Sequence, residues 1–203
     1  MFHVERCERG KAGVPRETTE RLKAYADLLL RWNPHINLVS RRDEPRLMER
    51  HIDDALQLVP LIPTGTTRGI DLGSGGGLPG LVLAIATGIH FDLVESDKRK
   101  AIFLREAARI TETSVTVHNS RVEELKLAPA TLLTARAFAP LPRLLALAHS
   151  LIAPGGILLL HKGKSVDLEL TDARAAWNMH VRKFPSKTDP GATILILSEV
   201  LPV

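Results

Sequence analysis

A glycine-rich run at residues 68–80 has the residue types and spacing best suited to chemistry, because it can hold a nucleoside-containing cofactor. A short apolar piece leads into the run and an apolar stretch follows it, which predicts a strand, a tight turn and a helix. Gly73, Gly75 and Gly77 remove side chains where the backbone must turn sharply and where a ligand must approach it. Exposed amides at the start of the following helix would complete this binding corner.

Two cofactor classes use such a corner. Residues 75–80 satisfy the dinucleotide fingerprint G-x-G-x-x-G, which by itself is a weak signal. Asp71 ends the predicted strand, where we expect its carboxylate to face the ligand, repelling a pyrophosphate and attracting the ammonium and sulfonium groups of S-adenosylmethionine. Glu95 ends the next apolar run, about 20 residues further on, and is expected to hold the ribose hydroxyls. The sequence therefore favours S-adenosylmethionine over a dinucleotide or a purely structural turn.

Composition sets the broad class of the chain. Its 203 residues are 44% hydrophobic and 25% charged, enough for one domain with a full core and a small extension. The single Cys7 excludes an internal disulfide, and no Cys/His array has zinc spacing, so we expect no metal. We find no signal-like segment and no run of about 18 apolar residues, which predicts a cytoplasmic protein with no membrane partner. The net charge of +4 fits an anionic partner or simple solubility. No long apolar seam is evident, so we expect a monomer.

The elements that must position the glycine-rich run alternate between strand and helix from Gly69 onward, as a doubly wound α/β sheet requires. The predicted strands lie near 68–72, 90–95, 114–118, 131–136, 155–161, 180–184 and 192–198, and the helices near 78–87, 98–110, 140–150 and 167–178. A turn-rich connection at 185–191 joins the last two strands and predicts an antiparallel hairpin at the edge. This pattern is that of a class I S-adenosylmethionine-dependent methyltransferase, a Rossmann-like fold whose seven-stranded sheet is mostly parallel. Ligands of such sheets lie beyond the carboxyl ends of the strands.

Residues 1–65 are expected to form a small helical N-terminal cap, and residues 66–203 the cofactor-binding domain. A first helix over 15–33 is predicted from one apolar face, formed by Leu22, Tyr25, Leu29 and Trp32. It should end at Asn33, because the residue before a proline avoids the helical region. A second helix is predicted from about Asp43 to Leu58.

Seven short motifs, taken together and in order, resemble the ribosomal RNA small subunit methyltransferase G family, also called GidB. These motifs are residues 31–38 (RWNPHINL), 50–54 (RHIDD), 71–80 (DLGSGGGLPG), 95–104 (ESDKRKAIFL), 120–123 (SRVE), 135–138 (ARAF) and 162–163 (KG). Each motif alone is weak, but the resemblance covers nearly the whole chain from about residue 20 to residue 200. The chain departs from the family pattern at Ala55, where serine usually follows the Asp54 carboxylate.

The resemblance implies a reaction and a set of site residues. The family methylates N7 of a guanosine in the 530 loop of 16S rRNA, at position 527, and turns S-adenosylmethionine into S-adenosylhomocysteine. The implied partner is 16S rRNA, the small ribosomal subunit or an assembly intermediate of it. The implied cofactor contacts are Gly73, Leu78, Val122, Glu123 and Arg136, and His51 is implied to lie beside the site of methyl transfer.

The residues agree with N7 chemistry on their own terms. Methylation of an exocyclic amine generally uses an Asn/Asp-Pro-Pro-aromatic loop after the fourth strand, whereas residues 135–140 read ARAFAP. Methylation at pyrimidine C5 needs a cysteine nucleophile, and Cys7 precedes the predicted cap. Guanine N7 has an in-plane lone pair and loses no proton. Catalysis by positioning, without a general base, is sufficient for it.

Each candidate residue also has a structural interpretation. Arg136 offers donors that suit a phosphate, a guanine O6 edge or the methionine carboxylate, and it could instead pair with a carboxylate at the sheet end. His51 could equally be a core histidine. Glu123 could face the adenine edge or cap a turn. Trp32 could pack inside the protein or stack on a base. The predicted RNA contacts are three arginines on one face of the second helix and three basic residues after strands, namely Arg42, Arg46, Arg50, Lys98, Arg99 and Lys162.

Two other enzyme classes stay open from the sequence. A methyltransferase of the same fold could act on a small molecule or a protein, and it should then lose little activity when the basic residues are neutralised. An NAD(P)-dependent oxidoreductase would use the same glycine-rich turn but should bind NADH rather than S-adenosylhomocysteine. A non-catalytic RNA-binding module would leave the cofactor loop unexplained.

Overall fold

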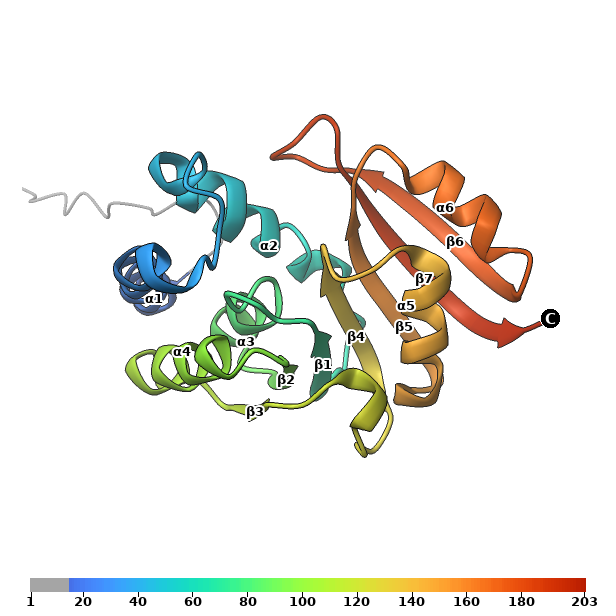
Figure 1. Ribbon diagram of the computed structural model, residues 1–203, viewed down its shortest axis with the longest axis horizontal. Coiled ribbons are helices and arrows are strands. Elements are labelled where there is room, and N and C mark those ends of the chain that lie inside the picture. The colour runs from blue at the N-terminus through green and yellow to red at the C-terminus, as the bar shows by residue number, and fades with distance from the viewer. Residues whose placement is uncertain (1–14) are drawn as a thin grey trace, which may run out of the picture.

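One seven-stranded sheet runs through the molecule (Figure 1). The computed structural model describes residues 15–203, so Cys7 and the rest of residues 1–14 lie outside the described part. The strand order is β3-β2-β1-β4-β5-β7-β6. The strands are β1 (Arg68–Leu72), β2 (His90–Val94), β3 (Val115–His118), β4 (Ala130–Arg136), β5 (Ile152–Lys162), β6 (Trp177–Pro185) and β7 (Thr193–Pro202).

The strands from β3 to β5 are parallel, whereas β7 is antiparallel to both β5 and β6. The predicted antiparallel hairpin at the edge is therefore confirmed, with β7 inserted between β5 and β6. Parallel strands need crossover connections, and helices supply them here. The longer helices are α1 (Arg16–Ile36), α3 (Gly80–Thr87), α4 (Lys98–Ile110), α5 (Leu141–Ala148) and α6 (Val166–Ala173).

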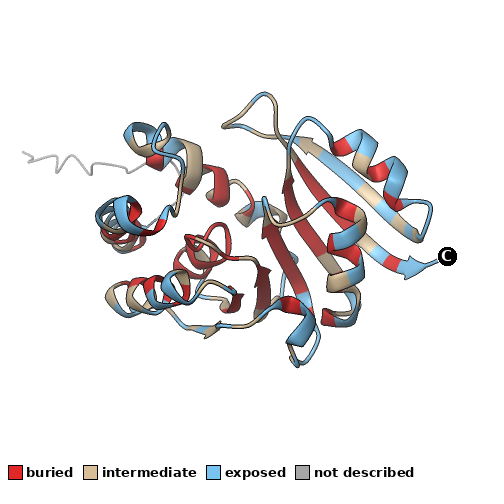
Figure 2. Cartoon of the chain, in the orientation of Figure 1, coloured by how far each residue is buried: buried red, intermediate tan, exposed pale blue. Residues whose placement is uncertain are grey.

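Two hydrophobic clusters, one on each face, hold these helices to the sheet. Successive residues of a strand point to opposite faces, so Leu159 joins the cluster beneath α1 and α3 while Leu158 and Leu160 join the cluster beneath α5 and α6. Figure 2 shows the result, with buried residues concentrated along β4, β5 and α3. The predicted α/β architecture follows from such continuous apolar runs, because a central strand is covered on both faces.

The first helix is longer than predicted. It continues through Pro34 to Ile36, because the Asn33 side chain caps its end by accepting hydrogen bonds from the amides of Leu38 and Val39 at 2.7 and 2.9 Å. Asn37 closes the helix in the left-handed conformation. The prediction that the helix ends at Asn33 was wrong, since a proline in the last turn removes only one backbone hydrogen bond.

The second helix is not continuous. The predicted helix over residues 43–58 is divided into a 3₁₀ turn (Glu44–Arg46), a π-helix (Met48–Asp53) and an α-helical turn, α2 (Asp54–Leu56). The 3₁₀ turn contains Pro45, and the wider π-helix changes the angular spacing of side chains. The prediction of one basic face formed by Arg42, Arg46 and Arg50 assumed a regular α-helical period, which this segment does not have.

The N-terminal segment packs into the same core as the sheet. Leu22, Tyr25 and Leu29 of α1 lie in one cluster with α3 and α4. The Tyr25 hydroxyl donates a hydrogen bond of 2.5 Å to the backbone oxygen of Gly76 in the glycine-rich loop. Burial raises the pKa of Tyr25, so its hydroxyl stays protonated as a donor. Over residues 15–203, no helix has the length and apolar character needed to cross a membrane.

Candidate functional site

The glycine-rich loop adopts the backbone conformations that the sequence predicts. Gly73, Gly75 and Gly77 have φ angles of +69°, +55° and +89°, a region that favours glycine. A Cβ atom on Gly73 would meet the ring of Phe138, and one on Gly77 would lie 2.9 Å from the Cβ of Leu81. The loop therefore needs glycine both for its turns and for its close neighbours.

A cavity of about 310 Å³ opens at the carboxyl ends of β1 and β2, where the cofactor is expected. Of the predicted cofactor residues, Gly73, Glu95, Val122 and Glu123 line this cavity. Val122 and Glu123 belong to a 3₁₀ turn (Val122–Glu124) that forms one wall. The other five predicted cofactor residues do not line it, namely Asp71, Gly75, Gly77, Leu78 and Arg136.

Glu95 is held rigidly at the cavity edge. Its Oε2 accepts a hydrogen bond of 2.8 Å from the amide of Gly75, and its Oε1 accepts one of 2.7 Å from the amide of Asp97. The residue is 8% exposed. One carboxylate thus links the end of β2 to the glycine-rich loop, and its remaining lone pairs suit a pair of ribose hydroxyls.

Asp71 is not where the sequence predicts it. The residue is 1% exposed, and its Oδ1 accepts a hydrogen bond of 2.6 Å from Thr134 of β4. The start of α3 covers it, because a Cβ on Gly80 would lie only 2.5 Å from the Asp71 Cβ. Burial raises the pKa of Asp71. The expectation of a carboxylate that faces the ligand is wrong for this structure, because Asp71 is buried against Thr134 of β4 and the start of α3.

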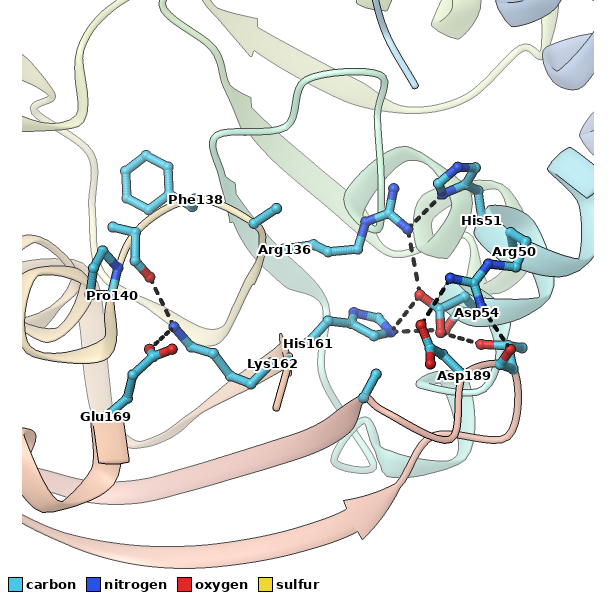
Figure 3. Close-up of a pocket in the computed structure, with 15 residues that line it drawn as sticks. Arg50, His51, Asp54, Arg136, Phe138, Pro140, His161, Lys162, Glu169 and Asp189 are labelled. Carbon is cyan, nitrogen blue, oxygen red and sulfur yellow. Dashed lines mark hydrogen bonds and ion pairs between the residues drawn. The ribbon is translucent and has the colours of Figure 1, made fainter. Parts of the chain in front are cut away.

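A second cavity, of about 520 Å³, adjoins the first and shares Ala137 and Phe138 with it. Figure 3 shows side chains that converge on it from the second helical segment, from the ends of β4 and β5 and from the β6–β7 connection. Arg136 ends β4, and its side chain and that of Phe138 point in different directions (Figure 3). Ala137 between them has a φ of +51°, a conformation that costs a non-glycine residue roughly 1 kcal/mol or more. This backbone turn directs the side chains on either side of Ala137 to different parts of the site.

Arg136 and His51, predicted separately, are in contact. The Arg136 Nη1 donates a hydrogen bond of 2.9 Å to His51 Nδ1 and lies 3.5 Å from Asp54 Oδ2. His51 Nε2 is 3.4 Å from Asp43 Oδ2 but is not aligned for a hydrogen bond. Because His51 accepts from a permanent cation, the imidazole is neutral and serves to orient the guanidinium.

Asp54 and His161 are functional candidates that the sequence reasoning missed. Asp54 Oδ1 accepts from Thr188 Oγ1 at 2.5 Å and from Gln57 Nε2 at 2.7 Å, and its backbone oxygen accepts from His161 Nε2 at 2.9 Å. The sequence did contain a signal for His161. It is the first polar residue after the apolar run of β5, near the carboxyl end of that strand. No local signal pointed to Thr188, which lies in the β6–β7 connection.

Two of the predicted RNA contacts are engaged inside the protein. Lys162 Nζ donates to Glu169 Oε2 at 2.7 Å and to the backbone oxygen of Ala139 at 2.9 Å, and its side chain is 9% exposed. Arg50 donates to Asp189 Oδ2 at 2.9 Å and to the backbone oxygen of Thr188. Both residues also line the larger cavity, so their contact with RNA stays a prediction.

The other four predicted RNA contacts, Arg42, Arg46, Lys98 and Arg99, lie exposed at the surface. Arg46 pairs with Glu49 at 2.6 Å, an exposed pair of the kind that contributes little. Lys98 and Arg99 open α4, where Asp97 caps the helix by accepting hydrogen bonds from two amides. Their contact with RNA stays a prediction.

His51 should make the stability of the protein depend on pH. Burial and the nearby Arg136 guanidinium lower the pKa of His51 from 6.5 to about 4, so the unfolded chain binds the extra proton first as the pH falls. The free energy of unfolding is therefore expected to decrease between about pH 6.5 and pH 4. Burial also lowers the pKa of His161, which adds to the same decrease.

Urea denaturation at pH 7 and pH 5 checks this expectation. The variant His51→Asn should show a smaller loss of stability between the two pH values than the wild type does. The variant His180→Asn, which changes a 73% exposed side chain, should match the wild type. An equal loss in all three proteins would remove His51 as the titrating group.

The model of one protein family, described as "GidB: rRNA small subunit methyltransferase G", matches residues 18–192. The chain belongs to the GidB family. A GidB relative from Granulibacter bethesdensis, a "Ribosomal RNA small subunit methyltransferase G", is 54% identical over 98% of this chain and 99% of its own length. A relative of the same name from Gluconobacter oxydans is 54% identical over 92% and 96%. The resemblance seen in the motifs is thereby confirmed.

Solved structures confirm the fold of this GidB protein. A TehB-like SAM-dependent methyltransferase from Corynebacterium glutamicum has a TM-score of 0.61 at 14% identity and covers 87% of this chain and 98% of its own. A T. thermophilus 16S rRNA methyltransferase, solved with AdoMet and guanosine, has a TM-score of 0.53 at 18% identity over 73% and 38%. The fold is that of a class I methyltransferase, and S-adenosylmethionine is the cofactor of this family.

The residues at the smaller cavity fit that cofactor. Glu95 presents a fixed carboxylate at the end of β2, and the glycine-rich loop keeps its backbone free of side chains beside it. The wall formed by Val122 and Glu123 is where the family pattern implies the adenine contacts. The individual contacts of each residue with the cofactor stay predictions.

Proposed function

We propose that this GidB protein transfers a methyl group from S-adenosylmethionine to N7 of a guanosine in 16S rRNA, at position 527 of the 530 loop. The observation that carries the proposal is Arg136 at the end of β4, which is fixed by His51 and Asp54 in the cavity that adjoins the cofactor cavity. An oriented guanidinium there suits O6 of guanine, which lies next to N7 on the same edge of the base.

Arg136 can serve as the guanine-recognition group because its internal contacts leave donors available. Both hydrogen bonds described for its side chain use Nη1, and the guanidinium carries further donors on Nε and Nη2. Its side chain is 19% exposed, so it reaches the cavity without being fully solvated. A donor held in this way costs little entropy when it binds a substrate oxygen.

The chemistry that the site supports needs positioning rather than proton transfer. When bound, S-adenosylmethionine supplies a methyl group activated by a positively charged sulfur. The guanine N7 lone pair lies in the plane of the ring and carries no proton, so the residues need only align N7 with the methyl carbon and exclude water. His51 already accepts a hydrogen bond from Arg136 and is therefore a positioning residue rather than a base.

The shared wall of the two cavities supports a direct transfer between them. Ala137 and Phe138 line both cavities, so the methyl donor and the acceptor base can approach each other across this short loop. Lys162 fixes the far end of the loop through the backbone oxygen of Ala139. We therefore assign Lys162 a structural role in the proposed mechanism.

Transfer of labelled methyl groups to RNA tests the proposal. The enzyme should label 16S rRNA or the small subunit, and mapping should place 7-methylguanosine at position 527. The matched control is the same RNA with adenosine at that position, which should accept no label. Label at another atom or base, or efficient labelling of the control RNA, would contradict the proposed specificity.

A further inference from the structure

A hollow of about 380 Å³ between α1 and α4 lies outside both cavities of the site. Its apolar lining is supplied by Trp32 and Ile36 of α1 and by Ile102 of α4. The basic residues Arg31, His35 and Arg99 also line the hollow. An apolar floor with basic residues at its edge is not a feature that the fold itself requires.

Trp32 forms a rigid aromatic wall of this hollow. Its ring packs against Phe103 with the ring centroids 5.7 Å apart and the planes inclined by 59°. The same ring is only partly buried, so core packing fixes it while the hollow keeps part of it accessible. Ile102 is 45% exposed beside it. A flat apolar group placed here would cover both side chains and remove apolar surface from water.

The hollow lies at the same edge of the sheet as the cofactor cavity. The helix α4 begins directly after β2, and the residues between them, Glu95 and Ser96, line the cofactor cavity. Arg99, in the first turn of α4, lines the hollow. A strand of RNA that reaches the active site can therefore continue across the start of α4 into this hollow.

Charge favours a nucleic acid over a protein segment as the occupant. Arg31 and Arg99 flank the hollow from two different helices and are both exposed. Two acidic residues interact with these arginines: Asp97, which caps α4, lies 3.7 Å from Arg99, and Glu106, which pairs with Arg109 at 2.8 Å, also interacts with the charge of Arg31. Such exposed pairs contribute little, so a phosphate can replace the carboxylate. An aromatic ring between two arginines is the arrangement by which proteins bind unpaired bases and their phosphates.

We propose that this hollow binds an unpaired nucleotide of the RNA substrate, with the base against Trp32 and Ile102 and the phosphates at Arg31 and Arg99. The inference rests on the proposed function, because it takes RNA as the substrate. It adds a second contact, separate from the base that is methylated. Stacking tolerates any base, so the contact strengthens binding to single-stranded RNA without reading its sequence.

Tryptophan fluorescence tests the stacking directly. The chain has two tryptophans, so the variant Trp177→Phe leaves Trp32 as the only one. Titration with a single-stranded RNA of about 12 nucleotides should quench the Trp32 emission, and the same strand annealed to its complement should quench it much less. Unchanged emission when the single strand is bound, as followed by fluorescence anisotropy of labelled RNA, would overturn the proposal.

Variants at the exposed positions avoid the core packing of Trp32. The variant Ile102→Glu should raise the KM for rRNA about 10-fold and leave kcat unchanged. Its matched control is Leu168→Glu, which places the same charge at a 65% exposed apolar residue of α6 and should change neither value. The double variant Arg31→Gln/Arg99→Gln should lower the slope of log K against log salt by about 1.4, the value for two single-strand phosphates.

These outcomes separate the two proposals. If the enzyme methylates N7 of the target guanosine but Trp32 is not quenched and Ile102→Glu binds RNA normally, the hollow is not a nucleotide site. If Trp32 is quenched by single-stranded RNA but methylation maps elsewhere, the proposed specificity fails and the hollow stands. A ribosomal protein as the occupant would show as Ile102→Glu impairing activity on the subunit and not on free rRNA, which overturns the hollow as a nucleotide site.

Discussion

Replacing Arg136 by alanine is expected to lower the rate of methyl transfer by at least about 10²-fold, because the acceptor base loses its alignment. The truncation removes the donor that His51 and Asp54 hold in place at 2.9 and 3.5 Å. Binding of S-adenosylhomocysteine should stay close to that of the wild type, since Arg136 does not line the smaller cavity. Single-turnover kinetics with labelled cofactor measure the first effect and calorimetry the second.

Two further variants make this result specific. Arg136→Lys keeps the charge but not the planar fork, so it should recover only part of the lost rate. Arg182→Ala removes an exposed arginine that lies over the ring of Phe184 on β6, and it should have wild-type kinetics. A folded Arg136→Ala enzyme with normal turnover would exclude the residue from the site. Weakened binding of S-adenosylhomocysteine would instead reassign it to the cofactor.

Replacing Glu95 by alanine is expected to weaken the binding of S-adenosylhomocysteine about 10²-fold, as loss of charge-assisted hydrogen bonds generally costs about 1.5–3 kcal/mol. The carboxylate accepts from the amides of Gly75 and Asp97, so its removal frees the glycine-rich loop as well as the proposed ribose contact. Calorimetric titration with S-adenosylhomocysteine measures the change. The affinity of Glu95→Gln for S-adenosylhomocysteine should lie between those of the wild type and Glu95→Ala, because its amide group keeps only one acceptor oxygen.

The matched control for Glu95 is Glu124→Ala. Glu124 is an exposed carboxylate in the 3₁₀ turn beside the cavity, but it does not line the cavity. The Glu124→Ala variant should bind S-adenosylhomocysteine as the wild type does. Equal weakening in both variants would point to the general negative potential of this edge, and wild-type binding in both would remove Glu95 from the cofactor site.

The fold could be predicted from the sequence because its signals are local. The run around Leu158, Leu159 and Leu160 is apolar at every position, as expected for a strand covered on both faces, and β5 has this placement. The spacing of Gly73, Gly75 and Gly77 predicted a sharp backbone turn that needs glycine, and all three residues have positive φ. Such features depend on a few neighbouring residues, so a single sequence contains them.

The errors concern contacts between distant parts of the chain. The sequence did not predict the ion pairs of Lys162 and Arg50, because their partners Glu169 and Asp189 come from other elements. Asp71 was expected to face the ligand because it lies at the carboxyl end of a strand, and the packing of α3 over it depends on the absence of a side chain at Gly80. None of these contacts can be predicted from a regular spacing of residues in the sequence, so they become apparent only in the folded structure.

The hydrogen bond between the Tyr25 hydroxyl and the Gly76 oxygen limits how the N-terminal segment can be truncated or exchanged. A shortened protein that begins after α1 would lose the donor on which the glycine-rich turn rests, together with the apolar cover of α3 and α4. Exchanging N-terminal segments between relatives would likewise alter the glycine-rich loop, because Tyr25 of α1 contacts its backbone. Changes to the proposed nucleotide contact are therefore better made at surface positions such as Arg31 and Ile102 than by exchanging the whole segment.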